Sequence, residues 1–347
     1  MASDVTRLSD LVIPEVFDNY VNDEVATKLN ILNSSAVSMD ASFNSFLAGA
    51  GNSFTTPMWL DNTDGDGNVA SDDPSQILET RKVTATSIIV PRMVRTNGWS
   101  ASNLDNILIA EDPVAEMIRQ ESIYRQKQIQ NQVLKSVTGI FANNALASDA
   151  YHEQKDMILD LSTANSGAYS AGVTNFTAEC LIDAISNMGD SQDELGLIFV
   201  HPRVYAQMKK QQLIETIQPA TVGALPIYMY GGYRVITNSL LPHEENDTVF
   251  TTYIFGSDQI RMGLGSVASP ISFHRDEKAG NGMGVTEVIT RYQNAIGING
   301  FSFVANVTGG GPDSSATAGN LANANSWRRV TGDRRNVKMV ALKTREA

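Results

Sequence analysis

The side chains with the strongest intrinsic chemistry are few in this sequence. There is one cysteine, Cys180, and the histidines are His152, His201, His243 and His274. A zinc site needs about four nitrogen or sulfur ligands with close pairs among them, and no histidine here has a second histidine or cysteine at such a spacing. His201 precedes Pro202 and is predicted to cap a helix, and Cys180, beside Leu181 and Ile182, is predicted to be buried. The sequence therefore predicts no zinc site and no cysteine nucleophile.

A second candidate for chemistry is the acidic run from Asp61 to Asp73. Counted from Asn62, oxygen-bearing side chains stand at positions 1, 3 and 5, a glycine at position 6 and an apolar residue at position 8. This approaches a helix–loop–helix calcium loop. It departs from that pattern because position 1 is Asn, position 12 is Asp73 instead of Glu, and no helix is predicted on either side. We predict an acidic loop that is mobile or held by a partner, and no metal.

Glycine-rich motifs do not point to an enzyme either. The segment Gly280–Gly284 lacks the lysine and hydroxyl residue of a phosphate-binding loop, and no strand leads into it with a helix after it. It is interpreted as a flexible turn. No G-x-S-x-G nucleophile motif occurs in the chain. We therefore predict no catalytic residue, no cofactor and no enzymatic activity.

Composition supports a folded, acidic protein. The chain has 347 residues, 42% of them hydrophobic, and a formal net charge of −12. This charge argues against binding of nucleic acid through a general basic face. From Trp327 onward, seven basic residues stand against two acidic ones, which leaves a charge of −17 for the rest of the chain. The N-terminus has no signal-peptide pattern and no apolar run approaches membrane-spanning length, so a soluble protein is predicted.

The first half of the chain predicts extended parts and one long helix. Residues 1–50 are polar, with short apolar clusters, and need another surface to lie on. Strand patterns at Phe54–Leu60 and Val83–Val90 flank the acidic loop and predict a long hairpin. Residues 113–142 predict a helix about 45 Å long, begun by Pro113 after the cap Asp112, with a narrow apolar stripe.

From about residue 174 the pattern changes to a compact α/β arrangement. Thr177 is predicted to cap a helix that ends before Gly189, and the glycines between Tyr228 and Tyr233 predict a hairpin. The predicted strands are Leu195–Val200, Ile227–Met229, Tyr233–Ile236, Val249–Phe255, Ile260–Leu264, Val285–Ile298, Phe301–Val304 and Val337–Leu342. A small-residue spacer runs from Gly309 to Asn325.

Three stretches and the order of all segments carry a resemblance to a known family. Thr6–Phe17, Val288–Phe301 and Asn320–Val340 are similar to parts of the major capsid proteins of tailed bacteriophages. The resemblance implies an α+β, Hong Kong 97-like phage capsid fold. Its parts are an N-terminal arm, an extended β-hairpin loop, a long spine helix, a peripheral domain and an axial domain.

The resemblance also assigns the parts of the chain. It implies an N-terminal arm at 1–50, the extended loop at 51–98, the peripheral domain with its spine helix at 99–173, the axial domain at 174–285, and return strands with the C-terminal tail at 286–347. Some relatives crosslink their subunits through a lysine on the extended loop. No lysine stands between Asp61 and Arg81, so no such crosslink is expected. No scaffolding segment is evident at the N-terminus.

By this resemblance the chain is a structural protein that self-assembles, as hexamers and pentamers, into an icosahedral head shell. The shell encloses double-stranded DNA, which it contacts without sequence specificity. A scaffolding protein, a portal and a decoration protein are further candidate partners, and no membrane is involved. The expected location is the virion, after assembly in the bacterial host cytoplasm. The alternative from the same fold is an encapsulin-like nanocompartment shell.

The acidic loop suggests where subunits meet. Its carboxylates at Asp61, Asp64, Asp66 and Asp73 need basic partners when many copies come together. We expect these partners on a neighbouring spine helix, at Arg119, Arg125 and Lys127, because the polar middle of that helix has no evident use within its own chain. The basic tail residues Arg328, Arg329, Arg334 and Arg335 are the alternative, and exposed charges that are merely solvated are the third reading.

Overall fold

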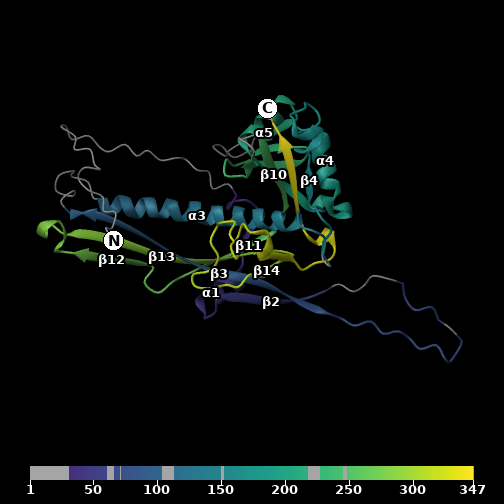
Figure 1. Ribbon diagram of the computed structural model, residues 1–347, viewed down its shortest axis with the longest axis horizontal. Coiled ribbons are helices and arrows are strands. Elements are labelled where there is room, and N and C mark those ends of the chain that lie inside the picture. Colours follow the sequence, from purple (N-terminus) through teal and green to yellow (C-terminus); the bar gives the residue numbers. More distant parts are fainter. Residues whose placement is uncertain are drawn as a thin grey trace.

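The computed structural model describes residues 31–60, 66–70, 72–103, 113–149, 152–217, 227–244 and 248–346. One long helix, α3 (Pro113–Asn144), packs against two β-sheets, and the molecule is elongated (Figure 1). Residues 1–30, which hold most of the predicted N-terminal arm, and the predicted cap Asp112 lie outside the described residues. The part of the arm that is described includes the short helix α1 (Ala41–Ala48), capped by Asp40.

The first sheet is long and narrow. Its strands are β1 (Val37–Met39), β2 (Ser53–Trp59), β3 (Ala85–Ser102), β11 (Ile260–Gly265), β12 (Ile271–Asp276) and β13 (Val285–Ile298). β13 is antiparallel to β3 from Val285, opposite Ser102, to Ala295, opposite Arg92. β11 and β12 lie one after the other along the free side of β13, and β2 pairs with the first part of β3. The predicted hairpin is confirmed, with β3 extending well beyond its expected end.

The second sheet is the compact part. Its strands are β4 (Ile158–Asp160), β16 (Met339–Arg345), β10 (Val249–Gly256), β5 (Leu195–Val200), β8 (Tyr233–Thr237), β7 (Ile227–Tyr230) and β6 (Ile214–Ile217), in this order, and β9 (His243–Glu244) pairs with β10. Helices α4 (Ala178–Ser186) and α5 (Pro202–Lys210) pack on one face over a core that includes Phe176, Ile198 and Phe250. The C-terminal strand β16 is an interior strand of this sheet, between β4 and β10.

Helix α3 begins and ends close to its predicted bounds, but it is not exposed along its whole length. Its first half covers β3 and β13, and there Met117 packs with Ala101 and Val288. From Ile129 to Asn144 every side chain is buried or half-buried, because the helix enters the core between the two sheets. The prediction of one narrow apolar stripe with free sides therefore fails for this second half.

A buried carboxylate fastens the first half of α3 to the long sheet. Glu121 is 6% exposed and accepts hydrogen bonds from Asn97 Nδ2 at 2.6 Å, Trp99 Nε1 at 2.7 Å and Thr290 Oγ1 at 2.7 Å. Buried carboxylates are tolerated when several donors satisfy their oxygens. The polar middle of the helix thus has a use within its own chain, contrary to the expectation from sequence.

Several local predictions are confirmed. Thr177 accepts a hydrogen bond from the Cys180 amide, and His201 caps α5 by accepting from the Arg203 amide. The hairpin of β7 and β8 turns at Gly231 and Gly232, both with positive φ. Cys180 is buried, and this burial raises the pKa of its thiol. Within the described residues, no helix has both the length and the apolar character that a membrane span requires.

The C-terminal third is packed more closely than its composition suggests. The turn Gly280–Gly284 forms the tip of a hairpin between β13 and β12, a strand that was not predicted. The spacer after Gly309 folds against α3, and Leu321 is fully buried. β14 (Phe301–Phe303) pairs with β15 (Trp327–Arg329). Further short helices in the described residues are η2 (Ala164–Gly167), η3 (Gly189–Glu194), η4 (Ala279–Gly282), η5 (Ala324–Ser326) and η6 (Arg334–Asn336).

The C-terminal third approaches α3 closely at Gly139. A Cβ atom there would lie 2.1 Å from the carbonyl oxygen of Leu321, which also accepts the hydrogen bond from Trp327 Nε1 at 2.7 Å. We expect Gly139→Ala to lower the free energy of unfolding by about 1–3 kcal/mol, because the backbone of the spacer must move away.

Gly98→Ala is the matched control, because a Cβ there meets no atom within 4 Å. It should change stability by about 0.5 kcal/mol or less. Urea unfolding of the subunit followed by circular dichroism measures both. Equal midpoints for the two variants would show that the spacer does not depend on close packing at Gly139.

Candidate subunit interface

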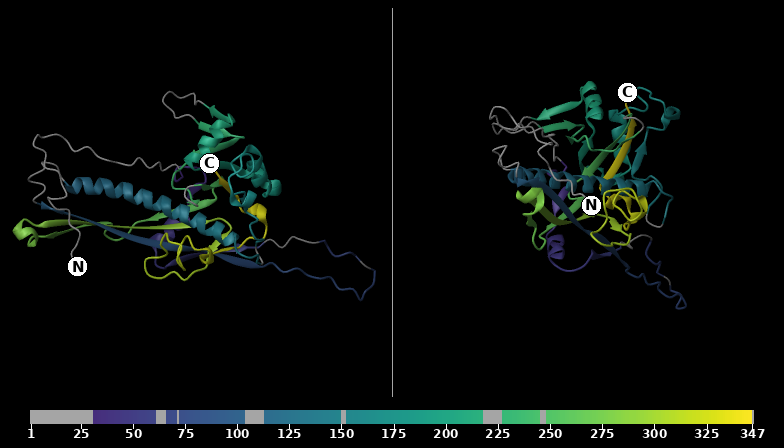
Figure 2. Two further views of the ribbon diagram at one scale, coloured as in Figure 1. Left: turned by 45° about the horizontal axis from the view of Figure 1, so that its top comes forward. Right: turned by 60° about the vertical axis from the view of Figure 1, so that its left-hand side comes forward.

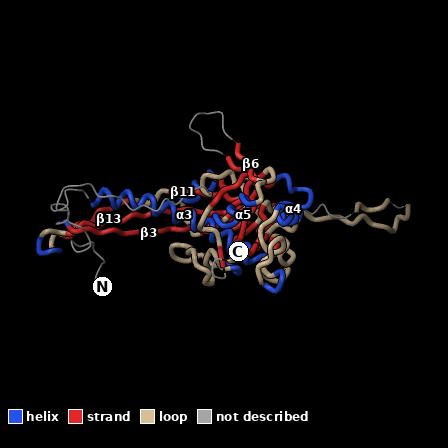
Figure 3. The backbone as a smooth tube through the Cα atoms, turned by 90° about the horizontal axis from the view of Figure 1, so that it is seen from above, coloured by secondary structure: helices blue, strands red, loops and turns tan. Residues whose placement is uncertain are grey.

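The extended loop leaves the body of the molecule as a thin hairpin. The two strands end at Trp59 and Ala85, and the described residues beyond them, 66–70 and 72–84, continue outward without helix or strand (Figures 1 and 2). Among the contacts between its two sides, Asn68 Nδ2 donates to the Glu79 carbonyl at 2.9 Å, and Arg81 donates to the Asp66 carbonyl. Seen from above, this loop and the far end of the long sheet point in opposite directions from the compact part (Figure 3).

The acidic residues of the loop are exposed where the structure describes them. Asp61 and Asp64 lie outside the described residues. Asp66, Asp72 and Asp73 are exposed, and Asp73 accepts hydrogen bonds from the Ser75 amide at 2.9 Å and the Ser75 hydroxyl at 2.7 Å. These hydrogen bonds lower the pKa of the Asp73 carboxyl, so it is ionised at neutral pH. The loop therefore presents fixed negative charge to whatever it meets.

The same loop exposes large apolar side chains, which the sequence analysis missed. The exposed fractions are 74% for Trp59, 91% for Val69, 88% for Ile77, 69% for Leu78 and 73% for Val83. The sequence feature that could have indicated them is the apolar pair Ile77–Leu78 inside an acidic, turn-rich segment. Exposed apolar groups gathered on one segment mark a surface that binds another protein.

The predicted basic partners on α3 already have contacts within the chain. Arg119 pairs with Glu116 at 2.7 Å, and the guanidinium of Arg125 lies over the Tyr292 ring, 4.8 Å from its centroid. Lys127 is half-buried. In Figure 1 the first half of α3 and the extended loop lie at opposite ends of the molecule. The structure therefore does not bring the acidic loop and these residues together in one chain, and a contact between them requires two copies.

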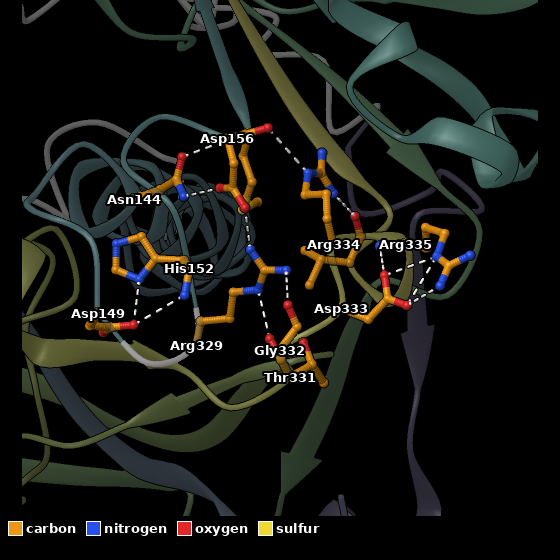
Figure 4. A network of polar contacts seen from close by, with 12 residues as sticks. Asn144, Asp149, His152, Asp156, Arg329, Thr331, Gly332, Asp333, Arg334 and Arg335 are labelled. Carbon is orange, nitrogen blue, oxygen red and sulfur yellow. Dashed lines mark hydrogen bonds and ion pairs between the residues drawn. The ribbon is translucent and has the colours of Figure 1, made fainter. Parts of the chain in front are cut away.

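Two of the alternative basic residues serve the interior. Arg329 has a side chain 1% exposed and pairs with Asp156 at 2.6 Å, while Asp156 also accepts from Asn144 at the end of α3 (Figure 4). Arg334 donates to the carbonyls of Val337 and Met339, and burial lowers its pKa to about 10. These two arginines join the end of α3 to the segment that leads into β16, so they are unsuitable partners for a neighbouring loop.

Arg335 and Arg328 remain on the surface. Arg335 pairs with Asp333 at 2.6 Å with a side chain 55% exposed, and Arg328 is exposed.

For a metal centre, no group of three or more His, Cys, Asp or Glu side chains comes together in the described part of the chain. His152 instead contacts Asp149 at 3.0 Å (Figure 4), and the His201 ring stacks on Phe250.

Comparison with known proteins finds similarity to phage capsid proteins. No protein-family model matches the chain. It is 29% identical to the major capsid protein of Bacillus phage SPP1 over 347 residues, with 98% of both sequences covered. Its structure is similar to the capsid of the cyanophage Pam1, with a TM-score of 0.57, 9% identity and 99% of both chains covered. The capsid of Ralstonia phage GP4 gives a TM-score of 0.56 at 10% identity, with 100% of this chain and 99% of the other covered.

The chain therefore has the fold of phage capsid proteins. The α+β, Hong Kong 97-like fold predicted from the sequence is confirmed, and so is the resemblance to the major capsid proteins of tailed bacteriophages. The match runs along almost the whole of each compared chain.

The arginines of the C-terminal segment allow a sharp comparison of buried and exposed ion pairs. Arg329→Met should lower the free energy of unfolding by about 3 kcal/mol or more, because it leaves Asp156 without its buried partner. Arg335→Met breaks a pair between two partly exposed side chains and should cost about 1 kcal/mol or less. Denaturant unfolding of both variants checks this. If Arg329→Met is no more harmful than Arg335→Met, the network of Figure 4 does not fasten the end of α3 to the segment that leads into β16.

Proposed function

We propose that this protein is the major capsid protein of a tailed bacteriophage, which assembles into the icosahedral shell around the packaged genome. The observation that carries the proposal is the extended loop, which exposes five large apolar side chains on a fold shared with phage capsids. A monomer gains nothing from such a loop, since exposed apolar surface is unfavourable in water. A shell subunit gains burial each time the loop lies on a neighbouring copy, and many such contacts add together.

Each part of the chain then has a role in the shell. Residues 1–50 form the N-terminal arm, 51–98 the extended loop, 99–173 the peripheral domain with α3 as spine helix, and 174–285 the axial domain. Residues 286–347 return to the peripheral domain. The packing supports one refinement of the last range: β16 is an interior strand of the sheet that carries α4 and α5, so the C-terminus also completes the axial part.

The partners follow from this role. The subunit binds further copies of itself, as hexamers and pentamers. The scaffolding protein, portal and decoration protein are candidates on the same grounds. Packaged double-stranded DNA lies against the inner face without base-specific contacts, and the net charge of −12 keeps that contact weak. The protein resides in the virion after assembly in the host cytoplasm. No contact among the described residues favours the encapsulin-like alternative.

Self-assembly tests the proposal directly. The purified full chain should form rings, capsomers or closed shells in negative-stain microscopy and sediment far faster than a monomer. A variant with Ile77→Asp and Leu78→Asp should stay folded, because both side chains are exposed, and should remain unassembled, because the loop no longer buries apolar surface.

The matched control carries Ile77→Val and Leu78→Met, which keep the apolar character, and it should assemble like the wild type. Sedimentation velocity across a wide concentration range gives the distribution of species. A wild-type chain that stays monomeric at every concentration, even with lysate from infected cells, contradicts the proposal.

The placement of the acidic loop against Arg119, Arg125 and Lys127 of a neighbour stays a prediction. Reversal of Arg125 and Lys127 to Glu should leave the subunit folded and slow shell formation, with a larger effect at low salt, where charges are less screened. Gln126→Glu is the control, since it adds one negative charge at the exposed position between them. Normal shells from the reversed variant at all salt concentrations would mean that these residues are solvated surface.

A further inference from the structure

The glycine-rich turn between β12 and β13 has no role in the proposed function. It includes η4 and lies at the tip of the hairpin, at the end of the long sheet away from the extended loop (Figures 1 and 3). The turn contains the pair Asn281–Gly282. An asparagine followed by glycine is prone to lose its side-chain amide, because glycine has no Cβ atom to shield its peptide nitrogen. Two further pairs of this kind are Asn97–Gly98 and Asn299–Gly300.

The loss of the amide proceeds through a succinimide ring. The peptide nitrogen of the glycine gives up its proton and attacks the side-chain carbonyl carbon Cγ of the asparagine, an intramolecular step that needs only local rotation. A bond forms between this nitrogen and Cγ, the bond between Cγ and Nδ2 breaks, and ammonia leaves with the proton. Water then opens the ring at one of its two carbonyl carbons. Attack at Cγ gives aspartate, and attack at the backbone carbonyl gives isoaspartate.

The pair Asn281–Gly282 is open to this reaction. Both residues are exposed, and a Cβ atom at Gly282 would meet nothing within 4 Å. Asn281 has φ 57° and ψ 38°, in the left-handed region, which is unfavourable for a residue with a side chain. Rotation of its backbone toward the geometry of attack therefore leaves an unfavourable conformation.

The hydrogen bonds that fasten the turn lie beyond the reactive pair. Asn103 donates from its backbone N–H to the Gly284 carbonyl at 3.1 Å and from Nδ2 to the Met283 carbonyl at 3.1 Å. Its Oδ1 accepts from the Thr286 hydroxyl at 2.8 Å. These contacts hold the start of β13, so residues 281 and 282 can rearrange while the hairpin stays in place.

The other two pairs are held by the fold. Asn97 lies within β3, paired with β13, and its Nδ2 donates to the buried carboxylate of Glu121 at 2.6 Å. Asn299 Nδ2 donates to the Asp258 carbonyl at 2.7 Å, and Gly300 is buried. In both pairs the amide must lose a hydrogen bond, and the backbone must leave its packed position, before the ring can form.

We propose that Asn281 is a site of spontaneous deamidation, which converts it to aspartate and isoaspartate while Asn97 and Asn299 stay intact. The tip from Arg275 to Gly284 has two basic and two acidic side chains, so its formal charge changes from zero to −1. Isoaspartate also lengthens the backbone of the turn by one methylene group. Negative charge at this end of the long sheet therefore increases with the age of the protein. The reaction requires no second copy of the chain, so it is independent of the proposed function.

Peptide mapping of the folded full chain after incubation in mildly alkaline buffer tests the proposal. Trypsin cuts after Lys278 and Arg291, and the peptide between them has Asn281 as its single amide side chain. Mass spectrometry should show this peptide converted from amide to acid, as two products that separate on chromatography. Its rate should exceed the rates at Asn97 and Asn299 by roughly tenfold or more, because each of those amides must first lose a hydrogen bond.

The chain unfolded in guanidinium chloride is the matched control for the effect of the fold. All three pairs then have free backbones and should convert at similar rates. Asn281→Gln keeps an amide at the exposed turn but requires a larger ring, so its peptide should stay unchanged over the same time. Folded protein in which the three pairs react alike, or in which Asn281 stays intact, overturns the proposal.

Discussion

The structure depends on the burial of the second half of α3 between two sheets. Ile140 and Phe141 pack in one core with Met93 and Ile296 of the long sheet and with Phe199 of the compact sheet. Phe141 stacks on Tyr253 with ring centroids 5.1 Å apart, and burial raises the pKa of that tyrosine. Each such side chain contributes about 1.5–3 kcal/mol when removed from water. One helix therefore joins the long sheet and the compact sheet into a single unit.

The C-terminal segment packs against the second half of α3, where the helix contacts the two sheets. Arg329 pairs with Asp156 beside the end of α3, and Leu321 packs on the helix near Gly139. Arg334 donates to the carbonyls of Val337 and Met339, at the start of β16. Buried arginines are costly unless their donors are satisfied, and here carboxylate and carbonyl oxygens do this. The basic end of the chain is thus an internal part of the fold, and its charge is unavailable to DNA or to a neighbour except at a few exposed positions such as Arg328 and Arg335.

The extended loop, unlike α3, exposes its apolar side chains. It has no core of its own, and its side chains Val69, Ile77 and Leu78 are almost fully exposed in one copy. In the shell proposed above, the free energy that orders the loop comes from its burial against other copies.

Local pattern was enough for much of the fold. The long helix from residue 113, eight strands between Leu195 and Leu342, the caps at Thr177 and His201 and the buried Cys180 were predictable, because periodicity and capping act over a few residues, whereas β12 was missed. The resemblance of segment order supplied the fold class. Tertiary structure decided what no local pattern contains: that Glu121 is buried beneath Trp99 and Thr290, and that Arg329 and Arg334 face inward. These outcomes depend on residues far apart in the chain coming together, so only packing could determine them.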